Sequence, residues 1–248
     1  MTATNGTGLR VVVLTGAGVS TGSGLRPFRG PGALYDDQVV ALVSADNLPG
    51  SLPALWGFID DRRRELATAE PNAAHRAIAA AQRAVRAAGG ELLCTTQNGD
   101  GLHQRAGTAD VAELHGSFLR TRCLDDGCSS EPFDEAEPHD PDARCPVCGS
   151  PQRPDVVLFG EVPDAYASWV TKRALREVDL FVAAGTSGLV APANGLVANA
   201  KFGGARTVLV NLEDHEDPHP DFDERHLGRA EDLLPDLLPR LLATPRHP

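Results

Sequence analysis

Four of the five cysteines lie close together in the chain, as two pairs of thiols, Cys123 with Cys128 and Cys145 with Cys148. Two thiol pairs at such short spacings are typical ligands of a tetrahedral Zn²⁺ in a ribbon-like knuckle. Four thiolates complete the coordination shell, so this zinc is expected to be structural rather than catalytic. The remaining cysteine, Cys94, falls in an apolar run and is expected to be a small core side chain.

Two glycines, Gly16 and Gly18, stand directly after a short β-branched run at residues 9–15, with Ala17 between them. Glycines at a strand-to-helix turn let backbone N–H groups approach a pyrophosphate at a helix N-terminus. Thr21 occupies the third glycine position of the usual G-x-G-x-x-G pattern, so a purely structural turn is the alternative. Because no acidic residue ends a second strand about 20 positions later, an ordinary dehydrogenase is disfavoured.

A polar segment at residues 96–103 follows a second predicted strand. The amide and carboxylate groups of Gln97, Asn98 and Asp100 suit ribose hydroxyls and a carboxamide, and an Asn-Gly turn with solvated side chains is the alternative. His115 comes just before the cysteine-rich stretch. An imidazole titrates near neutrality, which makes His115 a candidate general base, although a single histidine is more often a structural residue.

These groups need a scaffold, and the apolar pattern predicts strands that alternate with helices. Strands are expected at 9–15, 91–96, 156–159, 179–184 and 207–211, and helices at 52–68, 72–88, 166–177, 192–200 and 230–242. This alternation indicates an α/β fold with a Rossmann-like parallel sheet, whose ligands bind at the carboxyl ends of the strands. The stretch 123–153 is too poor in apolar residues to fold by burial alone, which again favours a metal.

The composition limits the class of protein and of partner. A chain of 248 residues with 42% hydrophobic and 23% charged residues is long enough for one large or two unequal domains. The formal net charge of -11 disfavours nucleic acid as the main ligand and suits a cationic partner such as a lysine-bearing peptide. The sequence contains no apolar run near the roughly 20 residues of a membrane span and no secretory signal pattern. We therefore expect a cytoplasmic protein that binds neither nucleic acid nor membrane.

In this order, the motifs resemble those of the sirtuin (Sir2) family of bacterial type, which are NAD⁺-dependent protein-lysine deacylases. The resemblance covers nearly the whole chain and rests on the four cysteines, Asn211 and the segments 16–20, 28–30, 96–100, 115–116, 153–161 and 185–187. It implies a Rossmann-like NAD-binding domain and a smaller domain, which combines a helical insertion with the zinc module. The large domain would comprise residues 1–29, 71–117 and 156–248, and the small domain residues 30–70 and 118–155.

The resemblance also implies NAD⁺ and one structural Zn²⁺ as cofactors, and an acyl-lysine protein or peptide as substrate. His115 would be the base, with Asn98 and Asp100 beside it, and the acyl group would pass from lysine to ADP-ribose with release of nicotinamide. Further contacts to NAD⁺ are expected from Gly16, Ala17, Gly18, Ser20, Phe28, Arg29, Gln97, Gly185, Thr186, Ser187, Asn211, Glu213 and Ala230. The peptide would add as a strand between Val157, Phe159, Gly160 and Glu161 on one side and Gly188 and Leu189 on the other.

Two departures from the family pattern bear on specificity. Gly99 stands where sirtuins usually carry Ile or Val beside the nicotinamide pocket. Arg62 matches an arginine of the desuccinylating branch, which would pair with a carboxylate, but Ile59 replaces the tyrosine of that branch. We expect deacetylation, with weak desuccinylation.

Two other functions fit the same motifs. A mono-ADP-ribosyltransferase would share the cleavage of the nicotinamide–ribose bond and differ only in the group that captures the ribose. A catalytically silent NAD-sensing module would need the glycine turn and the zinc, but it would not need the combination of Asn98, Asp100 and His115.

Overall fold

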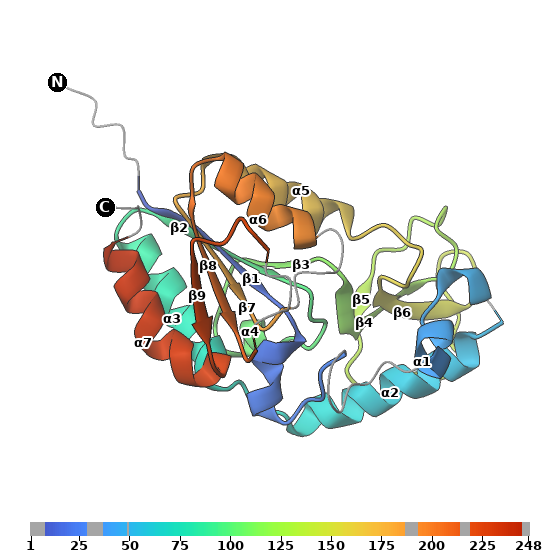
Figure 1. Ribbon diagram of the computed structural model, residues 1–248. Coiled ribbons are helices and arrows are strands. Elements are labelled where there is room, and N and C mark those ends of the chain that lie inside the picture. Colours follow the sequence, from blue (N-terminus) through green and yellow to red (C-terminus); the bar gives the residue numbers. More distant parts are fainter. Residues whose placement is uncertain (1–7, 29–36, 49, 187–192, 214–218, 245–248) are drawn as a thin grey trace.

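The computed structural model describes residues 8–28, 37–48, 50–186, 193–213 and 219–244 (Figure 1). The larger of its two sheets has the strand order β3-β2-β1-β7-β8-β9, and every pairing in it is parallel. Its strands are β1 (Arg10–Thr15), β2 (Glu91–Thr96), β3 (Val111–Glu113), β7 (Leu180–Ala184), β8 (Arg206–Asn211) and β9 (Glu224–Leu227). The Rossmann-like α/β fold expected from the sequence is confirmed.

Helices cover both faces of this sheet. One face carries α3 (Ala73–Ala87) and α7 (Ala230–Ala243), and the other carries α5 (Ala165–Ala174) and α6 (Ala193–Phe202) (Figure 1). The central strand β1 shows why, since Val11 and Val13 belong to one apolar core and Val12 and Leu14 to the other. Successive side chains of a strand point to opposite faces, so a continuous apolar run must be buried on both.

The second sheet is small and antiparallel, with the strand order β5-β4-β6. It comprises β4 (Gly116–Cys123), β5 (Phe133–Asp134) and β6 (Gln152–Val156), and it lies beside α1 (Asp37–Leu42) and α2 (Leu52–Thr68) (Figure 1). The strand expected at 156–159 is therefore misplaced, because the regular strand is β6 and the apolar residues after it pack against α2. The division of the chain into domains stays a prediction.

Short helical segments complete the fold. They are η1 (Ala17–Ser23), η2 (Ala45–Asn47), α4 (Leu102–Arg105) and η3 (Leu175–Glu177). Gly16 is thus the N-cap of a 3-10 helix, and Gly18 lies within this helix.

A buried arginine of α2 ties this helix to the small sheet. Arg63 donates hydrogen bonds to the Phe118 carbonyl at 2.9 Å, to Glu135 Oε2 at 2.9 Å and to Thr121 Oγ1 at 3.1 Å. Its guanidinium also lies over the Trp56 ring. A charge in the interior is tolerated only when it is paired and hydrogen-bonded, so these contacts fix α2 against β4 and the loop after β5.

Candidate functional site

The polar segments predicted to bind a ligand meet at the carboxyl end of the large sheet. Gly16 follows β1, Gln97 follows β2, and Gly185 follows β7. Thr186 Oγ1 donates to Gln97 Oε1 at 2.7 Å, and Asn211 Nδ2 lies 3.4 Å from the Thr186 carbonyl oxygen. Parallel strands bring their carboxyl ends to one edge, and this is where α/β folds bind ligands.

The glycines of the first turn are required by close backbone packing against the end of β7. A Cβ on Gly16 would lie 2.7 Å from the Gly185 carbonyl oxygen, and a Cβ on Gly18 would lie 2.8 Å from Gly185 Cα. The N–H groups of Gly16 and Gly18 donate to the carbonyls of Ala184 and Gly185, so they hold the turn in place. Within the described chain, the N–H of Ala17 makes no such bond and remains a donor for a phosphate.

Asn98 is held in one orientation behind this turn. Its Nδ2 donates to the Gly16 carbonyl at 3.1 Å and to Ser20 Oγ at 3.2 Å, and Ser20 Oγ donates to Asp100 Oδ2 at 2.6 Å. Asp100 Oδ1 in turn accepts from the Leu102 N–H at 3.0 Å. Asn98 Oδ1 is buried and has no hydrogen-bond partner in the described structure. An unsatisfied buried acceptor costs about 1–3 kcal/mol, and a carboxamide NH₂ such as that of NAD⁺ would satisfy it.

Two buried histidines, which the sequence did not single out, extend this network. His103 Nε2 lies 2.9 Å from Thr15 Oγ1, His75 Nε2 lies 3.4 Å from Ser20 Oγ, and the two rings are 4.8 Å apart. Burial lowers the pKa of His75 to about 3 and that of His103 to about 4, so both rings are neutral. His75 also closes a capping box with Asn72 at the start of α3, although a histidine at this position is not part of the usual sequence signature.

His115 has the tautomer that a general base needs. Its Nδ1 lies 3.1 Å from the Gln97 carbonyl oxygen, and because a carbonyl can only accept, Nδ1 carries the proton. Nε2 of the neutral ring is therefore unprotonated and can accept a proton. Burial lowers the pKa of His115 below its ordinary value, and the bond to Gln97, which favours the charged ring, offsets only part of this effect.

A cavity that is open to solvent lies between the first turn and α2. It is lined by Ala17, Ser20, Leu25, Arg26, Phe28, Arg62, Glu65, Leu66, Asn98, Gly99, Asp100 and Phe118. The predicted acyl-pocket residue Ile59 is not among them. Ile59 is 1% exposed and packs in the apolar core between α2 and β6. Arg62 does line the cavity, where its guanidinium is paired with Glu65.

The two residues expected at the adenine end of NAD⁺ differ in exposure. Glu213 is exposed after β8, whereas the side chain of Ala230 is 5% exposed and belongs to the core under α7. Arg29, Ser187, Gly188 and Leu189 lie outside the described residues. The roles assigned to the individual site residues stay predictions.

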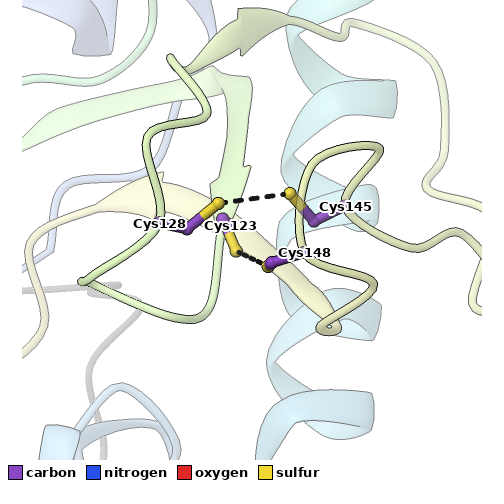
Figure 2. A group of neighbouring side chains, drawn as sticks. All are labelled: Cys123, Cys128, Cys145 and Cys148. Carbon is purple, nitrogen blue, oxygen red and sulfur yellow. Dashed lines mark hydrogen bonds between the residues drawn. The ribbon is translucent and has the colours of Figure 1, made fainter.

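The four cysteines form one cluster between β4 and the loop before β6 (Figure 2). Their sulfurs all lie within 4.8 Å of one another, with Cys123 and Cys148 3.5 Å apart and Cys128 and Cys145 3.6 Å apart. Thiolates about 2.3 Å from a tetrahedral zinc are about 3.8 Å apart, so the cluster fits this ion. Hydrogen bonds from the Cys148 and Val147 N–H groups lower the pKa of Cys145 to about 6, whereas burial raises the pKa of Cys123 to about 12.

Comparisons with known proteins agree with this arrangement. The Sir2 family model matches residues 16–192. The chain is 39% identical to an NAD-dependent protein deacylase of Pasteurella multocida over 239 residues, which is 94% of this chain and 98% of the relative. The protein of the same name from Escherichia coli is also 39% identical, over 94% of this chain and 82% of its own length.

Solved structures of similar fold include a complex of a Sir2 homologue with NAD, with a TM-score of 0.82 and 31% identity over 94% of this chain and 89% of the other. A second, at 27% identity and a TM-score of 0.77, is a Sir2 protein with a deacetylated p53 peptide and 3′-O-acetyl ADP-ribose, matched over 95% of this chain and 93% of the other. With its parallel sheet, polar cleft and cysteine cluster, the chain belongs to the Sir2 family.

Proposed function

We propose that the chain is an NAD⁺-dependent protein-lysine deacylase, with deacetylation as its main activity and nicotinamide and O-acyl-ADP-ribose as products. Its relatives at 39% identity are named NAD-dependent protein deacylases. The observation that carries the proposal is His115, whose unprotonated Nε2 is set by a bond to the carbonyl of Gln97, the residue next to Asn98. A silent NAD-sensing module would not need a histidine whose Nε2 is held unprotonated.

Different residues of the site would bind NAD⁺, accept the proton and exclude water. NAD⁺, when bound, would supply the ribose carbon that the acyl oxygen of the substrate lysine attacks, with nicotinamide as the leaving group. Asn98 Oδ1 would accept from the carboxamide, because the bonds of Asn98 to Gly16 and Ser20 leave this atom unpaired. His115 would accept a hydroxyl proton at Nε2. Phe28, 6.2 Å from the Phe118 ring, lines the cavity and would exclude water from it.

The peptide would pair with fewer backbone atoms than the sequence predicted. The Val157 N–H donates to the His115 carbonyl at 3.0 Å. Phe159 is also engaged, since its N–H donates to Val43 and its carbonyl accepts from Ala45. The Val157 carbonyl and the Gly160 N–H make no backbone hydrogen bond within the described chain, and strand addition would use these two groups.

The expected absence of nucleic-acid and membrane partners, and the cytoplasmic location, stay predictions. In the part of the chain that the structure describes, each helix is too short or too polar to cross a membrane.

The acyl preference should depend on Glu65. Arg62 is already paired with Glu65, and the Arg26 guanidinium lies 3.8 Å from the same carboxylate, so a succinyl group would meet a carboxylate as well as arginines. The variant Glu65→Gln is therefore expected to raise the ratio of desuccinylation to deacetylation about tenfold, as measured by kcat/KM with matched peptides. Glu70→Gln, at an exposed pair with Arg105, is the control and should leave the ratio unchanged. A wild-type preference for succinyl-lysine would contradict the proposal of deacetylation.

Mass spectrometry separates the proposed activity from its alternatives. With NAD⁺ and an acetyl-lysine peptide, we expect the mass of the peptide to fall by that of one acetyl group. One nicotinamide should be released for each peptide converted. A gain of ADP-ribose on protein, without loss of the acetyl group, would identify a mono-ADP-ribosyltransferase. Binding of NAD⁺ without nicotinamide release would identify a silent sensing module.

A further inference from the structure

We propose that Arg153 and Glu161 are positioning residues for the acyl-lysine peptide, because their ion pair holds the turn Leu158–Glu161 that presents the Val157 carbonyl and the Gly160 N–H. The inference rests on the proposed function. It also replaces the direct substrate contact expected for Glu161, since the carboxylate of this residue is bonded within the protein.

The ion pair is bidentate and largely buried. Arg153 Nη1 donates to Glu161 Oε1 at 2.5 Å, and Arg153 Nη2 donates to Glu161 Oε2 at 3.1 Å. The Arg153 side chain is 4% exposed and the Glu161 side chain 23% exposed. A planar guanidinium with two parallel bonds to a carboxylate fixes the orientation of both groups as well as their distance.

The same two side chains bond to the backbone at the start of the turn and just before it. Glu161 Oε2 accepts from the Leu158 N–H at 2.8 Å, and the Glu161 N–H donates to the Leu158 carbonyl at 3.0 Å. Arg153 Nη2 also donates to the Val156 carbonyl at 2.9 Å. Gly160 has a φ of 92°, a conformation that type II turns require at their third residue and that glycine adopts without strain. The turn is thus closed by the Glu161 side chain as well as by its backbone.

Val157 and Phe159 connect the turn to the catalytic candidate and to the segment between α1 and η2. Val157 is bonded to the carbonyl of His115, and Phe159 to Val43 and Ala45. The imidazole is held separately by the Gln97 carbonyl, so loss of the ion pair should displace the peptide-pairing groups and leave the imidazole in place. Burial alone would raise the pKa of the Glu161 carboxyl, but the bonds from Arg153 and the Leu158 N–H hold it below its ordinary value, so the pair stays charged.

The test is the kinetics of Glu161→Gln, which keeps the size of the side chain and removes its charge. We expect KM for an acetylated peptide to rise about tenfold, with kcat and the Kd for NAD⁺, measured by calorimetry, within twofold of the wild type. Arg153→Lys should raise the same KM, because an ammonium cannot form both bonds. If Glu161→Gln folds poorly, Glu161→Asp, which keeps the carboxylate, should show a smaller rise in KM. The control is Asp110→Asn, which removes an exposed ion pair with Arg86 and should leave KM unchanged.

Two results would overturn the inference while leaving the proposed function intact. One is a wild-type enzyme that deacylates the peptide and a folded Glu161→Gln variant with unchanged peptide KM. The other is an equal loss in kcat and in NAD⁺ affinity, which would indicate a general structural role. A wild-type protein with no deacylase activity would instead refute the proposed function itself.

Discussion

Replacement of His115 by alanine is expected to lower kcat for deacetylation by about 10²- to 10⁴-fold, the usual contribution of a positioned general base. The imidazole is held by the Gln97 carbonyl with Nε2 unprotonated, and alanine offers no group that could accept the proton. The loss should fall on catalysis alone, because the hydrogen bond of the His115 ring is to the Gln97 carbonyl and not to a cysteine. It is measured as nicotinamide release and peptide deacetylation at saturating NAD⁺, with the far-UV spectrum and the zinc content as checks on the fold.

His226→Ala provides the matched control. This histidine lies on the edge strand β9, where its Nε2 is 3.4 Å from Glu224 Oε2, and its removal should leave kcat within about twofold of the wild type. If His115→Ala retained most of the activity, another group would have to be the base. The buried rings of His75 and His103 would then be the next residues to replace.

The pH profile offers an independent check on His115. A base acts in its neutral form, which predominates above its pKa, and burial lowers the pKa of His115. The acid limb of kcat should therefore lie below about pH 6.5, the ordinary value for histidine, and the rate should be level near pH 7. The limb should disappear in His115→Ala. An acid limb above pH 6.5 in the wild type would contradict the assignment.

Cys145→Ser is expected to abolish both the bound zinc and the deacylase activity. The apparent binding free energy of a structural zinc is about 10–16 kcal/mol, which is comparable to the whole stability of a typical domain. The segment around the cysteines has few buried apolar residues to replace this contribution. The loss of zinc should also weaken the packing of α2, because Arg63 of this helix is bonded to Glu135 in the cysteine segment. Zinc content by atomic emission and the midpoint of thermal unfolding measure the two losses.

Cys94→Ala distinguishes the loss of a ligand from the loss of any thiol. Cys94 is fully buried in β2, away from the cluster, and burial raises the pKa of its thiol. Its replacement should cost stability in the core but leave about one zinc per chain. A Cys145→Ser protein with full zinc content and normal activity would show that the four thiolates do not form the site. Removal of zinc by a chelator should reproduce the Cys145→Ser result.

The sequence predicted the large sheet best at its centre. Strands β1, β2, β7 and β8 lie within a residue or two of the expected runs, because strands buried on both faces must be continuously apolar. It missed β3 and β9 at the two edges. β9 (Glu224–Leu227) alternates between half-buried and exposed side chains, so its sequence carries no run of apolar residues.

The site was predictable to the extent that it consists of local motifs. The cysteine pairs and the family resemblance were recognisable as patterns along the chain, and the cluster and the family are both confirmed. The cavity could not be predicted in the same way. Arg62 and Ile59 are three residues apart on one helix, yet Arg62 lines the cavity and Ile59 packs in the core. Helix rotation relative to neighbouring elements decides such assignments, and it depends on packing between distant segments.

By itself, the sequence determined the family, the parallel α/β sheet and the presence of four thiols suited to a zinc ion. Each of these depends on residue type and short spacing, which act locally on the chain. Only the tertiary structure decided the tautomer of His115, the pairing of Arg62 with Glu65 and the engagement of Glu161 by Arg153. These depend on hydrogen bonds and ion pairs whose geometry is set once separate elements have packed, and no spacing in the sequence encodes that geometry.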